Sequence, residues 1–187
     1  MDHVILERRL ADHCAPTLLG AKAASLLSLS EAEFPDLASA LRQYNRALYR
    51  TGLRFIILRQ LGGRFLVLVY RPAMLRSKLN LPEAKALLAR FSYPESNCLG
   101  ALIKHLKSRF GTSAEFPHEI GLFLDYPAAD VEAFMTGAAE CKLRGYWKVY
   151  CDVEAARERF ACYDACRQCM LRMLAAGSTI SQLLRAA

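Results

Sequence analysis

The sequence predicts an α+β fold: a mostly helical single domain over residues 1–187, with a small antiparallel sheet covered by helices. The predicted sheet consists of a hairpin over residues 53–71 and a strand over residues 145–150. Two runs of β-branched and aromatic residues flank a pair of glycines, the stretch 145–150 alternates in polarity, and most other apolar residues recur at helical spacing. Neither βαβ alternation nor a glycine-rich phosphate loop is present, which disfavours a doubly wound nucleotide-binding fold.

Apolar stripes predict three helices before the hairpin, over residues 3–12, Pro16 to about Leu29, and Phe34 to Arg50. Proline suits the first helical position, because its missing N–H would have no helical partner there. In the third helix Arg42, Arg46 and Arg50 recur every fourth residue and therefore form one basic ridge.

The hairpin is predicted from its turn as much as from its strands. Leu53–Arg59 and Arg64–Arg71 are the two strands, and Gly62-Gly63 lies between them. Glycine tolerates the positive φ that tight hairpin turns need. The strand Gly145–Tyr150 is expected to pair with this hairpin.

Helices are predicted for most of the remaining chain. Proline favours the first turn of a helix, a polar residue can cap the start of a helix, and glycine commonly ends one. The expected segments are Pro72–Leu79, Leu81–Phe91, a helix capped by Ser96 or Asn97 and ending near Phe110, the short apolar segment Ile120–Leu124, a helix after Tyr126-Pro127, a long helix from the Asp152 cap to Ala176, and a short last helix capped by Ser178.

Charge is unevenly distributed along the chain. The net charge is +7, and residues 42–109 hold fourteen Lys and Arg residues but only two acids, Glu83 and Glu95. Such a block indicates an anionic partner, or else a solvated surface balanced by acidic flanks within the fold. An anionic small molecule, an acidic protein or a carboxylated ligand such as haem fits it better than nucleic acid, because no nucleic-acid recognition motif accompanies it. We expect Arg42, Arg46, Arg50, Arg71 and Lys22 to contact the ligand.

The seven cysteines are expected to be free thiols of a cytoplasmic protein, since their number is odd and no secretory or membrane segment is evident. Cys162, Cys166 and Cys169 share one helix face, where packing explains them better than a metal site does. We predict no metal site. The sequence identifies no cofactor and leaves the oligomeric state and enzymatic activity open.

Cys14 is the main candidate for a reactive group. It lies beside His13 and just before the predicted helix start at Pro16, where exposed N–H groups favour a thiolate. A nucleophile, a persulfide carrier and a metal ligand are all consistent with this position, and so is a cysteine that simply packs at the helix entry. His118 and Glu119 are the other candidates for acid–base chemistry; alternatively, Glu119 supplies favourable charge at a helix start.

Several segments resemble an uncharacterised bacterial family, a domain of unknown function found mainly in anaerobic Gram-positive bacteria. The resemblance rests on five segments spread over nearly the whole chain: residues 13–18 (HCAPTL) with Gly20 and Lys22, residues 69–72 (VYRP), residues 118–124 (HEIGLFL), residues 126–127 and 130–131 (YP and DV), and residues 145–150 (GYWKVY). This chain has Asp125 where the family pattern tends to have glycine. The resemblance implies a full-length cytoplasmic domain and no particular reaction.

These observations support two hypotheses. The first is a ligand- or cofactor-handling protein, with thiol chemistry centred on Cys14. The second is a non-enzymatic binding module whose basic region, residues 42–109, contacts an acidic protein, nucleic acid or a carboxylated ligand such as haem.

Overall fold

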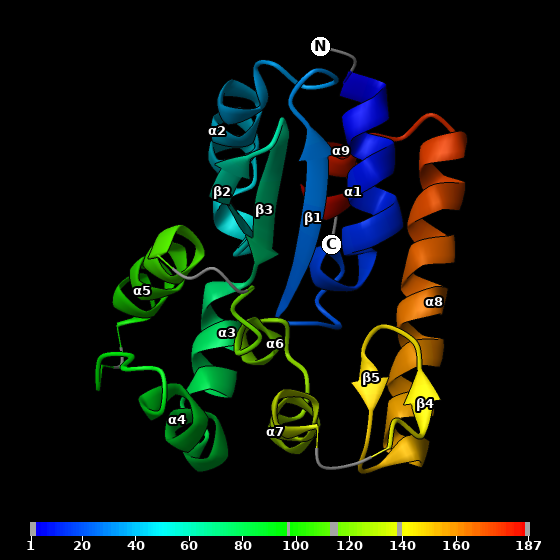
Figure 1. The fold of residues 1–187 in the computed structure, drawn as a ribbon. Coiled ribbons are helices and arrows are strands. Elements are labelled where there is room, and N and C mark those ends of the chain that lie inside the picture. The colour runs from blue at the N-terminus through cyan, green and yellow to red at the C-terminus, as the bar shows by residue number, and fades with distance from the viewer. Residues whose placement is uncertain (1–2, 97, 113–115, 138–139, 186–187) are drawn as a thin grey trace.

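A three-stranded antiparallel sheet lies between two layers of helices (Figure 1). The computed structural model describes residues 3–96, 98–112, 116–137 and 140–185. The strand order is β1-β3-β2, with β1 at Ala24–Ser30, β2 at Arg54–Leu61 and β3 at Arg64–Tyr70. The predicted hairpin is confirmed: Gly62 and Gly63 both have positive φ, 59° and 70°, as a two-residue turn requires.

The third strand of this sheet, β1, corrects the helix that the sequence predicted from Pro16 to about Leu29. Residues 24–30 form an edge strand, not the end of a helix begun at Pro16. Leucine and serine alternate from Leu27 to Ser30, and this places Leu27 and Leu29 opposite Val67 and Phe65 of β3. The burial gained by this pairing outweighs the helical spacing of the leucines.

The strand predicted at 145–150 does not join the hairpin. Only Lys148–Val149 is a strand, β5, and it pairs with β4 at Leu143–Arg144 in a separate two-stranded sheet. Gly145 lies in the turn between them, against the ring of Phe160; a Cβ at this position would overlap that ring. The alternation at 145–150 therefore reflects a small ribbon packed on a helix.

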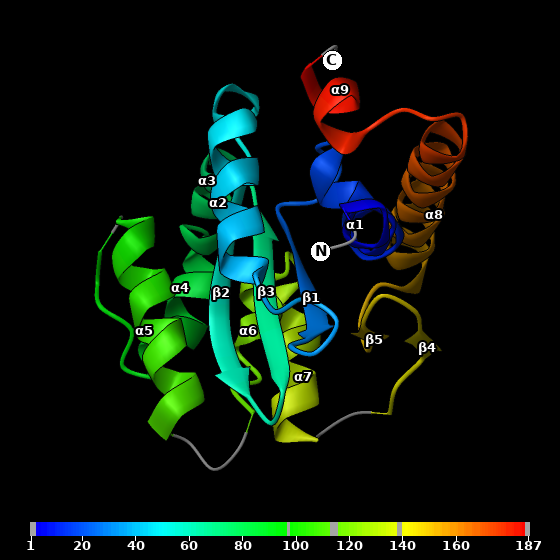
Figure 2. The ribbon, with the colours of Figure 1, turned by 90° about the horizontal axis from the view of Figure 1, so that it is seen from above.

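Helices α1 and α2 cover one face of the large sheet, together with the last helix, α9 (Figure 2). Their core contacts include Leu10, Leu37 and Ile180. Pro16 lies inside α1, and α2 is followed by a short 3-10 turn, η1. The bounds are His3–Leu18 for α1, Leu37–Ala47 for α2, Tyr49–Thr51 for η1 and Ile180–Arg185 for α9.

Five helices cover the opposite face, where Leu58 and Leu68 of the sheet meet Leu75, Leu106 and Phe123. They match the predicted segments closely. They are α3 at Pro72–Leu79, α4 at Pro82–Ala89, α5 at Leu99–Thr112, α6 at Ile120–Phe123 and α7 at Ala128–Thr136. Ser96 accepts a hydrogen bond from the backbone N–H of Cys98 ahead of α5; Asn97 lies outside the described residues.

Helix α8, at Val153–Ala175, packs along α1 at the side of the molecule, and the β4–β5 ribbon lies at its lower end (Figure 1). Asp152 caps it as predicted, accepting a hydrogen bond from the N–H of Ala155. The cap of α9 is Thr179 rather than Ser178, because Thr179 and Gln182 exchange side-chain hydrogen bonds with each other's backbone N–H.

Candidate functional site

The thiol of Cys14 is sealed inside the protein, which contradicts the hypothesis of an accessible, ionised cysteine. Its exposed fraction is 0%, and burial raises its pKa to about 12. Because α1 continues through Pro16, Cys14 lies in the C-terminal part of that helix rather than ahead of a helix start. The end of the helix dipole found there disfavours an anion. Cys14 is a core residue, and thiol chemistry at this position is not supported.

The other predicted catalytic residues lie apart from one another. His13 is exposed on α1, 3.6 Å from a carboxylate oxygen of Asp12. His118 precedes α6 and packs its ring against Phe134.

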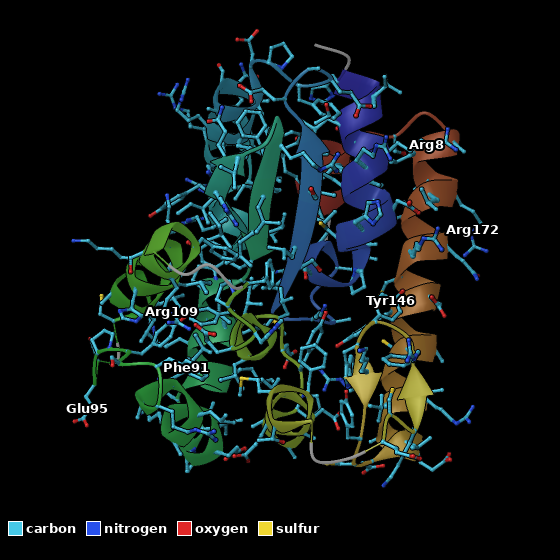
Figure 3. All side chains as sticks on the ribbon, in the orientation of Figure 1. Arg8, Phe91, Glu95, Arg109, Tyr146 and Arg172 are labelled. Carbon is cyan, nitrogen blue, oxygen red and sulfur yellow. The ribbon has the colours of Figure 1, made fainter. Side chains whose placement is uncertain are left out.

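Glu119 is fully buried and takes part in a structural contact. One of its carboxylate oxygens accepts hydrogen bonds from Arg109 at 2.9 Å and from the hydroxyl of Tyr93 at 3.3 Å. Arg109 also lies over the ring of Phe91, at 5.1 Å from its centroid, and both residues are labelled in Figure 3. Glu119 therefore connects the start of α6 to α5. The sequence predicted only a favourable charge at a helix start, and it did not predict this contact.

The cysteines of α8 show no arrangement for a metal. Cys162 is exposed, and Cys166 and Cys169 are half-buried. Within the described part of the chain, no group of three or more His, Cys, Asp or Glu side chains is placed to hold a metal ion.

The predicted basic ridge, by contrast, borders a large cavity. The cavity has a volume of about 1370 Å³ and lies among the C-terminal ends of α1 and α2, the turn η1, and α9. We call it the arginine pocket. Its arginines are Arg46, Arg50, Arg54, Arg71 and Arg185.

Arg71 is the structural member of this group. Its Nε, Nη1 and Nη2 atoms donate hydrogen bonds to the backbone carbonyls of Thr17, Thr51 and Leu18, at 2.7, 3.0 and 2.5 Å. Two of these carbonyls belong to the last turn of α1, where the partial negative charge of a helix accumulates. Arg71 neutralises that charge, so the end of α1 does not repel an anion in the pocket.

Arg54 positions an aromatic ring at the pocket wall. Its guanidinium lies 4.6 Å from the centroid of Tyr49 and donates to the backbone carbonyls of Tyr49 and Leu53. The ring of Tyr49 remains largely exposed, at 67%, and Leu19 adds a second exposed apolar side chain. The pocket thus offers an aromatic surface beside its charges.

Three arginines of the pocket can still bind an anion: Arg46, Arg50 and Arg185. All three are exposed, and none has an ion-pair or hydrogen-bond partner among the described residues. The lining contains no aspartate or glutamate. Of the arginines predicted to contact the ligand, Arg46, Arg50 and Arg71 line the pocket. Arg42 lies on the same ridge but does not line the pocket. Lys22 lies elsewhere, buried in the turn between α1 and β1.

Comparison with known proteins identifies the family. The family model described as "Protein of unknown function (DUF3793)" matches residues 10–184. This chain belongs to that family. The match spans nearly the whole chain, as the resemblance implied. No curated protein and no solved structure gives a significant match.

Proposed function

We propose that this member of the family binds a small anion that carries an aromatic group, in the arginine pocket. The observation that supports this most strongly is the convergence of Arg46, Arg50 and Arg185 on one cavity that no carboxylate lines. Guanidinium groups form strong charge-assisted hydrogen bonds with phosphates and carboxylates. A bound anion would also relieve the mutual repulsion of the three cations.

The distribution of the basic block favours a small ligand over a long polyanion. Arg76 and Lys78 lie on α3, and Lys104 and Lys107 lie on α5, so they are on the opposite side of the sheet from the pocket. The fold thus divides the block between two faces, and no continuous basic stripe follows from the sequence cluster. This argues against nucleic acid, whose binding depends on many successive phosphate contacts.

The shape and lining of the pocket also favour a small molecule over an acidic protein. A concave site with a few polar groups and an apolar wall is typical of small-ligand binding. Tyr49 supplies a flat surface for stacking, and Leu19 extends it. An aromatic anion such as a nucleotide or a porphyrin carboxylate would use both the charges and the ring.

Calorimetric titration with three probes tests this proposal. Pyrophosphate offers charge alone, ATP adds a purine ring, and metal-free protoporphyrin IX adds a larger macrocycle with carboxylates. We expect at least one of the two aromatic anions to bind more tightly than pyrophosphate, and the tighter of them indicates the ligand class. If none of the three binds at low ionic strength, the proposal is wrong.

The variant Arg185→Ala tests whether α9 contributes to the site. It should weaken binding of the tightest probe about tenfold, the usual effect of losing one charge-assisted hydrogen bond. Arg42→Ala is the matched control, because it removes an exposed arginine of the same ridge outside the pocket.

We also propose a cytoplasmic location. All seven cysteines are free, which is consistent with a reducing compartment. Among the helices in the described part of the chain, none has both the length and the apolar character needed to cross a membrane.

A further inference from the structure

A second cavity, of about 430 Å³, lies where the turn between α1 and β1 meets the β4–β5 ribbon and α8. We call it the lysine cavity. Its lining includes Lys22, together with His13, Tyr126, Tyr146, Asp164 and Arg167. Tyr146, labelled in Figure 3, lies between the ribbon and α8. The arginine pocket does not contain Lys22, so the two cavities are distinct sites.

Lys22 is buried, and its ammonium contacts aromatic rings rather than a hydrogen-bonding or ion-pair partner. Its exposed fraction is 5%, and its Nζ atom lies 5.1 Å from the ring centroid of Tyr126 and 5.7 Å from that of Tyr163. Within the described residues, Nζ forms no hydrogen bond and no ion pair. A lysine that served only the fold would be expected to have a carboxylate or carbonyl partner at this depth.

Lys22 nevertheless borders a cavity. It is one of the residues that line the lysine cavity, and its exposed fraction is small but not zero. A small molecule in this cavity would therefore lie beside the lysine side chain.

The carboxylate that acts electrostatically on Lys22 already pairs with other cations. Asp125 lies within electrostatic reach of Lys22, but its oxygens pair with Lys78 at 3.0 Å and with Arg159 at 3.4 Å. Arg159 also places a like charge near the amine. Burial lowers the pKa of Lys22 to about 8; Cys14 and Asp125 raise it, and Arg159 lowers it further. A desolvated amine beside another cation is the usual arrangement for a nucleophilic lysine.

We propose that Lys22 reacts reversibly with a small carbonyl compound that enters the lysine cavity, forming a Schiff base. The lone pair of the neutral amine attacks the carbonyl carbon, the carbonyl π electrons move to oxygen, and one proton passes from nitrogen to this oxygen to give a carbinolamine. The C–O bond then breaks, the hydroxyl takes the second proton of nitrogen and leaves as water, and the C=N bond of the imine forms. Addition of water reverses these steps and restores the amine and the carbonyl compound. No oxidant, reductant or cofactor takes part.

The mouth of the cavity indicates the kind of carbonyl compound. Arg167 pairs with Asp12 at 2.6 Å, and the hydroxyl of Tyr146 donates to Asp164 at 2.9 Å. These charged groups of the lining are therefore already engaged, and His13 lies 3.6 Å from the carboxylate of Asp12. Leu26 and Leu124 add an apolar lining. A small uncharged aldehyde or ketone fits this environment best.

Reductive labelling of the wild-type protein tests the proposal. The protein is incubated at pH 7 with propanal and sodium cyanoborohydride, and peptide mass mapping gives the rate at each lysine. At this pH an amine of pKa about 8 is neutral on the order of 200 times more often than an ordinary lysine. We expect Lys22 to be labelled at least about tenfold faster than exposed Lys104 and Lys107, after allowance for restricted access.

The pH dependence of the labelling provides a second readout. The rate at Lys22 should reach half of its maximum near pH 8, whereas the rates at the exposed lysines should still rise above pH 9. Lys22→Arg should remove the fast label, and Lys148→Arg, at an exposed lysine of β5, should retain it. The proposal is overturned if Lys22 is labelled no faster than Lys104 and Lys107, or if the labelling rate of Lys22 reaches half of its maximum near pH 10. Both results come from the wild-type protein, so they do not depend on whether a variant folds.

Discussion

At the scale of single residues, Asp125 shows how an unusual backbone conformation is retained. Its φ is 61°, in the left-handed region where glycine is the easiest residue to place. In this chain, the carboxylate offsets the strain by pairing with Lys78 and Arg159 and by accepting a hydrogen bond from the N–H of Ala23.

Cys14 provides a residue-scale prediction about chemical reactivity. Because its thiol is enclosed and its pKa is raised to about 12, it should resist alkylation while the protein is folded. Iodoacetamide treatment followed by peptide mapping should modify exposed Cys98, Cys151 and Cys162 first, and Cys14 only after unfolding. Rapid alkylation of Cys14 in the native protein would restore the rejected thiol hypothesis.

The candidate sites also show which functional residues can be predicted from their spacing in the sequence. Arg46 and Arg50 were predictable because residues four apart share a helix face. Arg185 was not, because it enters the pocket from a helix more than a hundred residues away in sequence. The electrostatic environment of Lys22 likewise depends on Asp125 and Arg159, which only the tertiary fold brings near it.

At the scale of secondary-structure elements, local signals predicted the elements that depend on local geometry. The glycine turn identified the hairpin, and proline and aspartate identified the starts of α3, α4 and α8. The edge strand β1 and the partner of β5 were missed, because strand pairing joins segments that are distant in sequence. A serine–leucine repeat is compatible with either structure until the fold provides a neighbouring strand.

The junction between α7 and the β4–β5 ribbon provides an element-scale prediction. The carboxylate of buried Asp130 accepts hydrogen bonds from the indole N–H of Trp147 and from the backbone N–H groups of Tyr150 and Cys151, all within 2.9 Å. Asp130→Ala leaves these donors without their acceptor, so it should lower the free energy of unfolding by about 3 kcal/mol. Urea unfolding followed by the fluorescence of Trp147 measures the loss.

Glu132→Ala is the control for this measurement, because it lies on the same helix and removes only an exposed ion pair with Arg90. Its cost should be below about 1 kcal/mol. Similar losses in both variants would show that Asp130 does not hold the ribbon in place.

At the scale of the whole molecule, buried acids connect elements that are far apart in sequence. Glu7 on α1 accepts hydrogen bonds from the hydroxyl of Tyr44 on α2 and from the N–H of Ile180 at the start of α9. Asp125 connects α3, α8 and the start of β1 in the same way. The Glu7 contacts join the helices on one face of the sheet, and the Asp125 contacts join α3, α8 and the start of β1.

A single cooperative unfolding transition follows from this connectivity. Trp147 reports on the cluster beneath α8, and far-ultraviolet circular dichroism reports on all the helices. The two signals should change with the same midpoint in urea, as expected for one domain. An earlier transition of Trp147 fluorescence would instead show that α8 and the ribbon unfold as a separate unit.

The anion-binding proposal depends on the cations that the fold gathers in one cavity, and a calorimetric comparison of two variants is its sharpest test. The double variant Arg46→Ala/Arg50→Ala and the single variant Arg42→Ala are titrated with the tightest of the three anionic probes. We expect the double variant to bind on the order of 100-fold more weakly than wild type, and Arg42→Ala to bind with nearly unchanged affinity. Equal affinities for the double variant and the wild-type protein would show that the anion does not bind in the arginine pocket.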